Sequence, residues 1–455
     1  MRICVIGTGY VGLVSGVCFA ELGHECICVD IDASKVERIN RGDPPIHENG
    51  LAEMLQRHAG KRLRATTDLA AAVRSCDITF IAVGTPFDGT RIDLSFVREA
   101  ARQIGTALRD KAGYHVVVVK STVVPGTTDD VVLPELEHAS GKRAGVDFGV
   151  GMNPEFLTEG VAIGDFMRPD RIVLGGIDAR AIDVQRQVYA SFAHTPTLAT
   201  NNKTAEMIKY TSNSVLATLI SFSNEIGNLC SALGGVDVAE VMQGAHAARY
   251  FTTTLEDGRS VKAPISSFLW AGCGYGGSCL PKDTKALSAH GAAHGAAMPL
   301  LDAVIATNLA QPARMLELLQ RHFPSLEGRH VALLGLAFKE DTDDMRESPA
   351  IPIAQMLVAR GVKVTAYDPI AQQAARAVLP REVEYAPNLE AAVQGVDAAM
   401  LVTRWDLFRV LPQLLAAQAQ PPVLIDGRRM LPRSAYPRYD GIGWRGAQAA
   451  CLPPT

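Results

Sequence analysis

The stretch RICVIGTGYVGLV, residues 2–14, determines the fold class of this chain. Its first half is an apolar, β-branched run that predicts a short buried strand, and GTGYVG at 7–12 predicts a tight turn that opens a helix. Four similar runs follow, with room for helices between them: CICVD (26–30), ITFIAVG (78–84), HVVVVK (115–120) and FGVGM (148–152). Strands alternating with helices indicate an α/β doubly wound domain, in which helices cover both faces of a parallel sheet.

This alternation stops near residue 201 and returns near residue 330. Residues 203–233 contain no proline and repeat apolar residues at helical spacing, which predicts one long helix or two nearly continuous ones. The later strand and helix patterns are HVALLGLAF (330–338), IPIAQMLVARG (351–361), KVTAYDP (363–369), AAMLVT (398–403) and VLIDG (423–427). We therefore predict two Rossmann-like domains, 1–200 and 324–455, joined by a helical middle domain, 201–323, whose long helix is expected to form the seam of a homodimer. The residues from Trp444 to the end carry no periodic pattern and are expected to be loose.

The composition excludes several classes of partner. A formal net charge of −4 gives no electrostatic footprint for nucleic acid, and the scattered histidines give no metal motif. No apolar run approaches the ~20 residues that a membrane span requires. The nine cysteines are dispersed, which is typical of reduced thiols in a cytoplasmic protein. Cys26 and Cys28 are expected on opposite faces of their strand, which would make them a poor metal clip.

The glycine turn at 7–12 is also a candidate dinucleotide site. Its glycines would permit the turn, the approach of a pyrophosphate and the packing of the helix on the strand. Asp30 ends the next strand, where a carboxylate would bind ribose hydroxyls and repel a 2′-phosphate, so NAD is favoured over NADP. The candidate contacts are Gly7, Gly9, Tyr10, Val11, Gly12, Asp30 and Lys35. The alternatives are a turn without a ligand and, for Lys35, an ordinary surface position.

Polar residues also follow the other predicted strands of the first domain. Thr85 stands in GTP (84–86) and Thr122 in KST (120–122), at strand ends where ligands of such sheets bind. Both are candidates for lining the cofactor cleft, with helix capping or turn chemistry as the alternative. Glu155, in NPEFLTEG after the fifth predicted strand, lies at the same edge.

The stretch GYGGSCLPKD, residues 274–283, places a cysteine in a glycine-rich turn. Pro281 suits the first position of a helix, so Cys279 would lie just before a helix N-terminus, where the partial positive charge favours a thiolate. Lys282 adds a formal charge nearby. The segment therefore predicts a nucleophilic sulfur, and the alternative is a buried cysteine in a turn.

Other basic and amide residues form two further candidate groups. Lys209 and Asn213 are four apart and share one face of the long helix, where they could polarise an oxygen atom if that face is buried. Lys339 and Arg346 stand in the glycine turn of the second Rossmann-like domain, and Arg428 follows another of its strands. Such a cluster suggests an anionic ligand such as a diphosphate, with plain surface charge as the alternative.

Together these motifs resemble the nucleotide-sugar 6-dehydrogenases, most closely the members that act on UDP-glucose. The matching stretches are GTGYVGLV, GTP, KSTV, NPEFLTEG, KTAEMIKYTSNSVLATLISFSNEIGNLC, GYGGSCLPKD, GLAFKEDTDDMRESPA and DGRR. The resemblance implies a four-electron oxidation of UDP-glucose to UDP-glucuronate with two NAD⁺ and one water. In that reaction Cys279 would form a thiohemiacetal and then a thioester.

The resemblance also implies a role for each candidate residue. Lys209 and Asn213 would stabilise oxyanions, while Asp283, Glu155 and Thr122 would position water and move protons. The implied cofactor contacts outside the first turn are Thr85, Thr122, Lys282 and Arg346. The implied substrate contacts are Glu155, Phe156, Leu157, Lys209, Asn213, Phe268, Leu269, Trp270, Ala271, Gly272, Gly276, Lys339 and Arg428, and the domain 324–455 would bind the UDP-sugar.

Three alternatives to this function remain open at the level of the sequence. GDP-mannose or UDP-N-acetylmannosamine could replace UDP-glucose with the same mechanism. A single-step hydroxyacid dehydrogenase would have no use for Cys279 or for a second nucleotide-like domain. A sensor that binds NAD without turnover would have no reason to combine Cys279 with Lys209 and Asn213. Asp283 could also be no more than an acid in the first turn of a helix.

Overall fold

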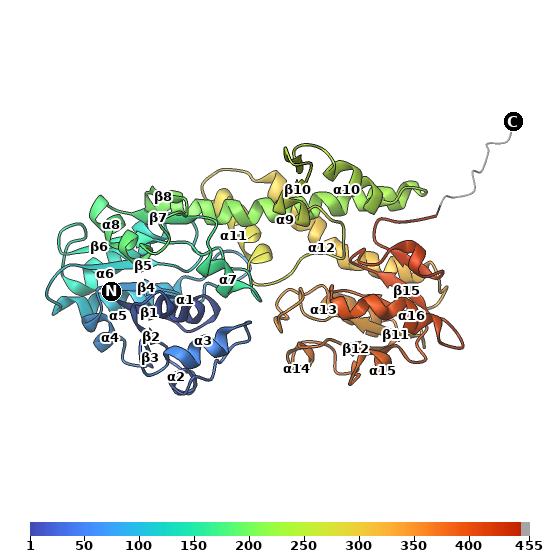
Figure 1. Ribbon diagram of the computed structural model, residues 1–455, viewed down its shortest axis with the longest axis horizontal. Coiled ribbons are helices and arrows are strands. Elements are labelled where there is room, and N and C mark those ends of the chain that lie inside the picture. Colours follow the sequence, from blue (N-terminus) through green and yellow to red (C-terminus); the bar gives the residue numbers. More distant parts are fainter. Residues whose placement is uncertain (447–455) are drawn as a thin grey trace. The chain divides into compact units, whose positions relative to one another are not determined.

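The computed structural model describes residues 1–446, so most of the segment expected to be loose, and Cys451 with it, lies outside the described residues. Backbone contacts divide the chain into two compact units, 1–212 and the residues from Asn213 onward (Figure 1). One helix, α9 (Asn202–Leu233), begins in the first unit and ends in the second. The long apolar pattern is therefore a single helix, as the simpler of the two expectations had it.

The first unit is built on an eight-stranded sheet in the order β3-β2-β1-β4-β5-β6-β7-β8. Its strands are β1 (Arg2–Ile6), β2 (Glu25–Val29), β3 (Leu63–Thr66), β4 (Ile78–Ile81), β5 (His115–Val119), β6 (Phe148–Met152), β7 (Ile172–Gly176) and β8 (Thr197–Thr200). All neighbours pair in parallel except β6 and β7, which are antiparallel. The strand order reverses between β1 and β4, which is the position where sheets of this kind bind ligands at their carboxyl ends.

Helices cover both faces of this sheet. They are α1 (Tyr10–Glu21), α2 (Ala33–Asn40), α3 (Leu51–His58), α4 (Leu69–Ser75), α5 (Ser95–Arg109), a π-helix (Thr128–Val132), α6 (Leu133–Ser140), α7 (Ala162–Met167) and α8 (Ala179–Val188). In β1, Ile3 and Val5 belong to one hydrophobic cluster, and Cys4 and Ile6 belong to another. Because alternate residues of a strand point to opposite faces, both faces of the sheet are buried. The doubly wound arrangement is confirmed.

The expectation for Cys26 and Cys28 is wrong. Both belong to the same hydrophobic cluster, on one face of β2. Side chains two residues apart in a strand share a face, because the pleat alternates with every residue. Both thiols are fully packed in the interior, and no cluster of potential metal ligands occurs within residues 1–446.

The second unit contains a six-stranded parallel sheet in the order β13-β12-β11-β14-β15-β16. Its strands are β11 (His330–Leu334), β12 (Lys363–Tyr367), β13 (Glu384–Tyr385), β14 (Ala398–Leu401), β15 (Val423–Asp426) and β16 (Tyr439–Gly441). The four central strands repeat the reversal seen at β1 and β4. The second Rossmann-like sheet expected from the sequence is therefore present.

Helices and a small hairpin complete the second unit. The helical segments are α10 (Val238–His246), a 3-10 helix (Pro264–Phe268), α11 (Leu280–Ala293), α12 (Pro299–Gln320), α13 (Ala350–Val358), α14 (Gln372–Ala375), α15 (Leu389–Val393), a 3-10 helix (Asp406–Val410), α16 (Leu411–Ala416) and a 3-10 helix (Arg433–Ala435). The hairpin pairs β9 (Thr252–Thr254) with β10 (Ser260–Lys262) in antiparallel fashion. Among residues 1–446, no helix is long and apolar enough to cross a membrane.

Candidate functional site

The turn between β1 and α1 has the geometry of a dinucleotide-binding loop. Gly7 has a φ of +95°, and a Cβ there would stand 2.7 Å from the carbonyl oxygen of Ala82. A Cβ on Gly12 would stand 2.0 Å from the carbonyl oxygen of Gly7, so the helix can approach the strand only with glycine at this position. Gly9 caps α1 and has no atom within 4 Å of its missing Cβ, so a phosphate can come close to the backbone there. Tyr10 and Val11 form the first turn of α1, half-buried.

The carboxylate of Asp30 is held beside this turn. It accepts hydrogen bonds from the backbone N–H of Thr8 at 2.8 Å, from the Thr8 hydroxyl at 2.5 Å and from the N–H of Asp32 at 3.0 Å. Burial by itself raises the pKa of Asp30, but these hydrogen bonds and the charge of Lys35 outweigh burial, so its pKa lies below the usual value. A charged acceptor next to the phosphate turn suits ribose hydroxyls and disfavours a 2′-phosphate.

The second sheet places an aspartate at the equivalent strand end, with a different use. The carboxylate of Asp368 is completely buried and accepts from the N–H groups of Leu336 at 2.7 Å, Ile370 at 2.9 Å and Ala371 at 2.8 Å. Its oxygens tie the turns that follow β11 and β12, so they hold the fold rather than face a ligand. Of these two aspartates, Asp30 is partly exposed and could meet a dinucleotide, whereas Asp368 is buried.

The predicted threonines meet at the carboxyl ends of β4 and β5. The Thr85 hydroxyl donates to the backbone carbonyl of Thr122 at 2.9 Å. This hydrogen bond fixes the two turns to each other at the edge of the sheet that carries the glycine turn. Thr85 is buried, whereas Thr122 is partly exposed.

Glu155 and Lys209 form a buried ion pair. The Lys209 ammonium lies 3.1 Å from the Glu155 carboxylate, and both side chains are 4% exposed. Glu155 also accepts from the N–H of Leu157 at 2.7 Å, and the Phe156 ring lies 5.5 Å from the Lys209 nitrogen. Burial raises the pKa of Glu155, but the charge of Lys209 and the hydrogen bonds outweigh burial, and the net direction is downward. Two residues that the sequence placed in separate motifs are thus direct partners.

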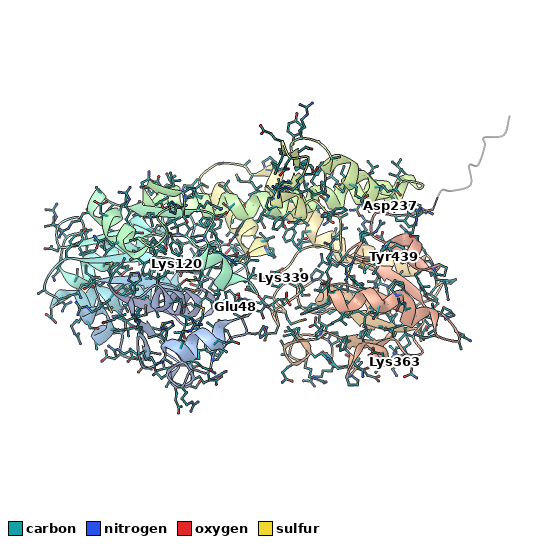
Figure 2. All side chains as sticks on the ribbon, in the orientation of Figure 1. Glu48, Lys120, Asp237, Lys339, Lys363 and Tyr439 are labelled. Atoms are coloured by element: carbon teal, nitrogen blue, oxygen red, sulfur yellow. The ribbon has the colours of Figure 1, made fainter. Side chains whose placement is uncertain are left out.

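Sequence reasoning missed a second buried cation, Lys120. Its side chain lies in the first unit (Figure 2). It follows β5 and donates to the side-chain oxygen of Asn153 at 2.9 Å. The Tyr189 hydroxyl donates to the same oxygen at 2.5 Å. The available signal was a lysine directly after a run of four valines, but KST was interpreted only through its hydroxyl groups.

Sequence reasoning also missed Glu48, which anchors the segment that follows Glu155. This buried carboxylate accepts from the N–H of Gly160 at 2.7 Å and of Ala162 at 2.8 Å, and from the hydroxyl of Tyr10. Burial and the neighbouring Glu48 raise the pKa of Tyr10. The Tyr10 hydroxyl therefore ties α1 to the NPEFLTEG segment, a use that the sequence did not predict.

The cysteine turn of the second unit is tightly packed. A Cβ on Gly276 would stand 2.3 Å from the carbonyl oxygen of Glu347, and Gly277 donates to the carbonyl of Arg346 at 2.8 Å. Cys279 is the N-cap residue of α11 and is partly exposed, with its sulfur 3.6 Å from the hydroxyl of Ser278. The expected position before a helix N-terminus is confirmed. Pro281, however, occupies the second position of the helix rather than the first, because the helix begins at Leu280.

A polar trio lies one turn further along α11. The buried carboxylate of Asp283 accepts from the side-chain amide of Asn213 at 2.6 Å and from the Lys282 ammonium at 2.5 Å. Asp283 is also the acid in the first turn of α11, so its charge interacts favourably with the helix dipole. The structure brings together Asn213, Lys282 and Asp283, which the sequence assigned to three different tasks.

The remaining predicted residues of the second unit fall into two groups. Arg428 donates to the backbone carbonyl of Gly274 at 2.7 Å and to that of Val402 at 2.5 Å. These hydrogen bonds connect the cysteine turn to the segment that follows β14. Arg346 is exposed and paired with Asp344 at 2.6 Å, while Lys339 stands half-buried in the turn after β11. In the stretch 268–272, Leu269, Ala271 and Gly272 are buried, whereas Phe268 and Trp270 are partly exposed.

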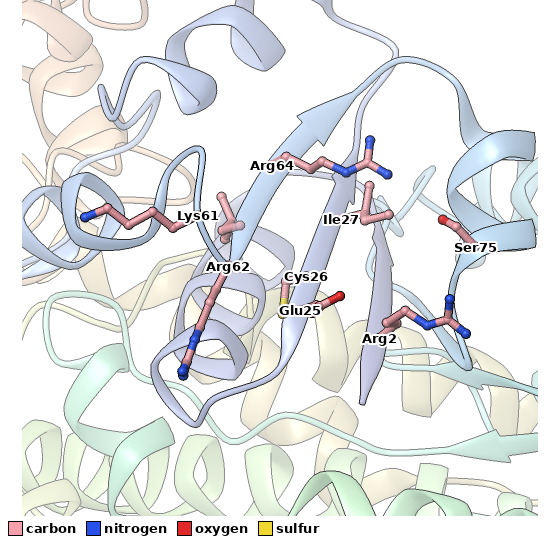
Figure 3. A pocket seen from close by; sticks show the side chains of 9 residues that line it. Arg2, Glu25, Cys26, Ile27, Lys61, Arg62, Arg64 and Ser75 are labelled. Atoms are coloured by element: carbon pink, nitrogen blue, oxygen red, sulfur yellow. The ribbon is translucent and has the colours of Figure 1, made fainter.

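The pocket in Figure 3 lies elsewhere on the first sheet. It has a volume of about 220 Å³ and is lined at the amino ends of β1 to β3 by residues that include Arg2, Glu25, Lys61, Arg62 and Arg64. Their charged ends point in different directions in the close-up (Figure 3). They therefore do not converge on one ligand, and the strand edge with the glycine turn remains the candidate cofactor site.

Three family profiles match the chain. Residues 1–193 match the NAD binding domain of the UDP-glucose/GDP-mannose dehydrogenase family, 203–310 its central domain and 332–433 its UDP binding domain. Together the matches follow the order of the two sheets and the helical middle.

Individual relatives and solved structures agree with these matches. The chain is 44% identical to the UDP-glucose 6-dehydrogenase of Haloferax volcanii, over 97% of this chain and 100% of the relative. It is 39% identical to the GDP-mannose 6-dehydrogenase of Pseudomonas putida, over 98% of this chain and 100% of the relative. A UDP-glucose dehydrogenase structure from Pyrobaculum islandicum superposes with a TM-score of 0.88 at 39% identity, covering 98% of each chain.

Proposed function

The chain belongs to the UDP-glucose/GDP-mannose dehydrogenase family, and within it we propose that this protein oxidises UDP-glucose to UDP-glucuronate with NAD⁺. The observation that carries the proposal is the place of Cys279, at the N-cap of α11 in a glycine turn, one helical turn before the buried Asp283. A single alcohol oxidation needs no such nucleophile. Relatives named for UDP-glucose that are 40–44% identical to the chain support the choice of sugar.

The residues of the first unit fit NAD. Gly9 leaves open space at the start of α1, and Asp30 presents a charged oxygen beside it, so the pair would hold the pyrophosphate and the ribose. Thr85 and Thr122 line the same strand edge. Lys282 and Arg346 are proposed as further contacts to the cofactor. When bound, NAD⁺ supplies the acceptor for the hydride in each of the two oxidations.

Cys279 would carry the substrate between those oxidations. Loss of a hydride and a proton from the primary alcohol gives an aldehyde, and the thiolate adds to its carbonyl carbon to form a C–S bond. Loss of the second hydride and of the hydroxyl proton from this thiohemiacetal leaves a thioester. Addition of water and cleavage of the C–S bond then release the carboxylate and regenerate the thiolate. A helix N-terminus favours the thiolate in both the attacking and the leaving step.

The other polar groups would stabilise charge and move protons. Lys209 and Asn213 are proposed to donate to the oxyanions of the tetrahedral states. Glu155 and Asp283 are buried, hydrogen-bonded carboxylates and, with Thr122, are proposed to orient the water and accept its proton. The division of these tasks follows the family resemblance, which also assigns the UDP-sugar to Lys339, Arg428 and the segment 268–272.

The experiment that tests this function counts NADH per sugar. Limiting UDP-glucose is incubated with excess NAD⁺, and the final absorbance of NADH is compared with the sugar consumed. Two NADH per sugar are expected. One NADH per sugar would contradict the covalent mechanism. Turnover with GDP-mannose or UDP-N-acetylmannosamine but not with UDP-glucose would mean that the other sugar nucleotide is the substrate. Binding of NAD⁺ without turnover of any of the three would indicate a sensor instead of an enzyme.

A homodimer and a cytoplasmic location are also proposed. Exposed apolar side chains recur every seven residues along α9, at Val215, Phe222 and Leu229, and Leu233 follows them. A stripe of this kind on a long helix suits a second copy of the chain. The cytoplasmic location rests on the dispersed cysteines, which favour a reducing compartment.

A further inference from the structure

A side-chain amide of α12 holds the backbone of the cysteine turn, residues 272–279. The backbone N–H of Tyr275 donates to the side-chain oxygen of Asn308 at 2.8 Å, and the Asn308 amide nitrogen donates to the backbone carbonyl of Tyr275 at 3.0 Å. Gly274 lies close to the same amide, because a Cβ there would stand 3.1 Å from the Asn308 side-chain oxygen. One carboxamide therefore satisfies both polar backbone groups of Tyr275, as a neighbouring strand would. The proposed mechanism gives Asn308 no role.

The turn depends on such support because it belongs to no regular element. Residues 271–279 form neither helix nor strand, and Gly274 and Gly277 have positive φ angles of 103° and 84°. Glycine is conformationally permissive, so the run GYGG (274–277) has little stiffness of its own. Tyr275 is buried, and its backbone polar groups would be costly to leave without partners. Contacts from other segments therefore determine the shape of the turn.

These contacts lie directly before the nucleophile. The next two residues of the turn, Gly276 and Gly277, contact the segment 346–347. Only Ser278 then stands between this contact and Cys279. α12 also packs against α11, the helix that Cys279 caps. The position of the sulfur therefore depends on how firmly the amide of α12 holds the start of the turn.

We propose that Asn308 is a positioning residue that keeps the Cys279 sulfur in place to capture the aldehyde before the aldehyde leaves the protein. In the capture step the thiolate adds to the carbonyl carbon, and the carbonyl oxygen takes up a proton. A misplacement of about 1 Å can slow such a step by about 10². If the turn can shift, the first oxidation still proceeds, but release of the aldehyde competes with its capture. The inference rests on the proposed function, because the aldehyde is an intermediate of that reaction.

The chain offers a matched pair of variants. Asn308→Leu removes both hydrogen bonds to Tyr275 with little change in side-chain size. Asn40→Leu is the control, because the Asn40 carboxamide makes the same pair of bonds to Ala65 of β3: it accepts from the N–H at 2.7 Å and donates to the carbonyl at 3.0 Å. Both variants therefore lose the same kind of support, and only Asn308→Leu loses it at the cysteine turn.

The test measures free aldehyde early in the reaction, with excess UDP-glucose and NAD⁺. Quenching with sodium borodeuteride reduces the aldehyde to UDP-glucose that carries one deuterium, which mass spectrometry compares with UDP-glucuronate. The wild-type protein and Asn40→Leu should form two NADH per UDP-glucuronate and no labelled sugar. In Asn308→Leu the rate of UDP-glucuronate formation should fall by about tenfold to a hundredfold, and labelled sugar should appear in at least equal amount. The NADH count per UDP-glucuronate should then exceed two, because each released aldehyde has already produced one NADH.

Two NADH per UDP-glucuronate and no labelled sugar from Asn308→Leu would overturn the proposal, and so would equal amounts of labelled sugar from both variants. If Asn308→Leu does not fold, Asn308→Asp keeps the shape and the acceptor for the Tyr275 N–H but loses the donor to the Tyr275 carbonyl, and it should also release aldehyde. Failure of both to fold would mean that the amide serves the fold alone, which contradicts the proposal. Absence of two NADH per UDP-glucuronate in the wild-type protein would instead show that the proposed function is wrong.

Discussion

The side-chain amide of Asn213 donates to the buried carboxylate of Asp283 at 2.6 Å, which joins α9 to the first turn of α11. Lys282 binds the other oxygen of that carboxylate at 2.5 Å. An acid held by two donors and fully removed from solvent has a fixed orientation. That orientation matters for a group one helical turn from Cys279, because proton transfer depends on position first and on pKa second.

Asp283→Asn should lower kcat by about 10²–10⁴ if Asp283 takes part in proton transfer, the usual range for such groups. Binding of NAD⁺ should stay within threefold of wild type. Asp302→Asn is the control, because Asp302 is likewise the acid in the first turn of its helix, α12. Initial rates and a fluorescence titration of NAD⁺ provide the comparison. Equal, small effects of both variants would mean that Asp283 serves only the helix dipole.

Cys279→Ala should bind UDP-glucose and NAD⁺ and yet form no UDP-glucuronate. The thioester cannot form without the sulfur, so the four-electron product is lost rather than slowed. Cys273→Ala is a suitable control, since that cysteine lies in the same turn with its sulfur fully buried. The product is measured by anion-exchange chromatography after a long incubation. UDP-glucuronate at wild-type yield from Cys279→Ala would exclude covalent catalysis.

Asp30→Ala should weaken NAD⁺ binding by about tenfold to a hundredfold, the value of one or two hydrogen bonds to a charged group. It should also reduce the preference for NAD⁺ over NADP⁺, because the charge that repels a 2′-phosphate is gone. Asp32→Asn keeps a good N-cap on α2 and serves as the matched control. Calorimetric titration with NAD⁺ and with NADP⁺ measures both affinities. An unchanged NAD⁺ affinity in Asp30→Ala would contradict the assignment of Asp30 as a contact to the cofactor ribose.

The sequence predicted most of the strands whose burial shows in their composition, but β7, an apolar run buried along its whole length, was missed. β1, β4 and β5 are runs of apolar, largely β-branched residues buried in the sheet interior. The missed strands β3 and β8 carry exposed or polar residues, and the missed strand β13 is only two residues long. These segments form strands because neighbouring strands pair with them, and their composition does not show that pairing.

The candidate site was predictable where its residues are close in the chain. Gly7, Gly12 and Asp30 follow a local strand–turn–helix–strand pattern, and Cys279 stands next to its helix. The pairing of Glu155 with Lys209 depends on how α9 packs against the first sheet, which no spacing reveals. Lys120 was missed for a related reason: a lysine after a strand is usually at the surface, and only the surrounding structure shows that it is buried.

His115 should make the folded protein sensitive to acid. Its ring is buried in β5 with one nitrogen 2.9 Å from the Thr79 hydroxyl, and burial lowers its pKa from 6.5 to about 3. The folded-state pKa is depressed, so the stabilisation is complete above pH 6.5 and is lost as the pH falls towards 3. Between pH 7 and pH 5 the free energy of unfolding should fall by about 2 kcal/mol because of this residue.

His115→Leu should remove that pH dependence, whatever its effect on stability at pH 7. Urea unfolding of the wild-type protein and the variant at pH 7, 6 and 5 gives the slope. His138, exposed on α6, provides the control His138→Gln, which should keep the wild-type slope. The same slope in His115→Leu and in wild type would show that the acid sensitivity has another origin.

Phe222→Glu should convert the proposed homodimer to a monomer. Phe222 is 54% exposed and lies at the middle of the stripe formed with Val215 and Leu229. In a dimer interface along α9, a glutamate at this position would be buried without an oppositely charged partner, which is energetically costly. Tyr250→Glu is the control, because Tyr250 is also exposed but lies outside α9. Light scattering after gel filtration should give half the wild-type mass for Phe222→Glu alone. A wild-type monomer, or a Phe222→Glu dimer, would exclude this stripe as the seam.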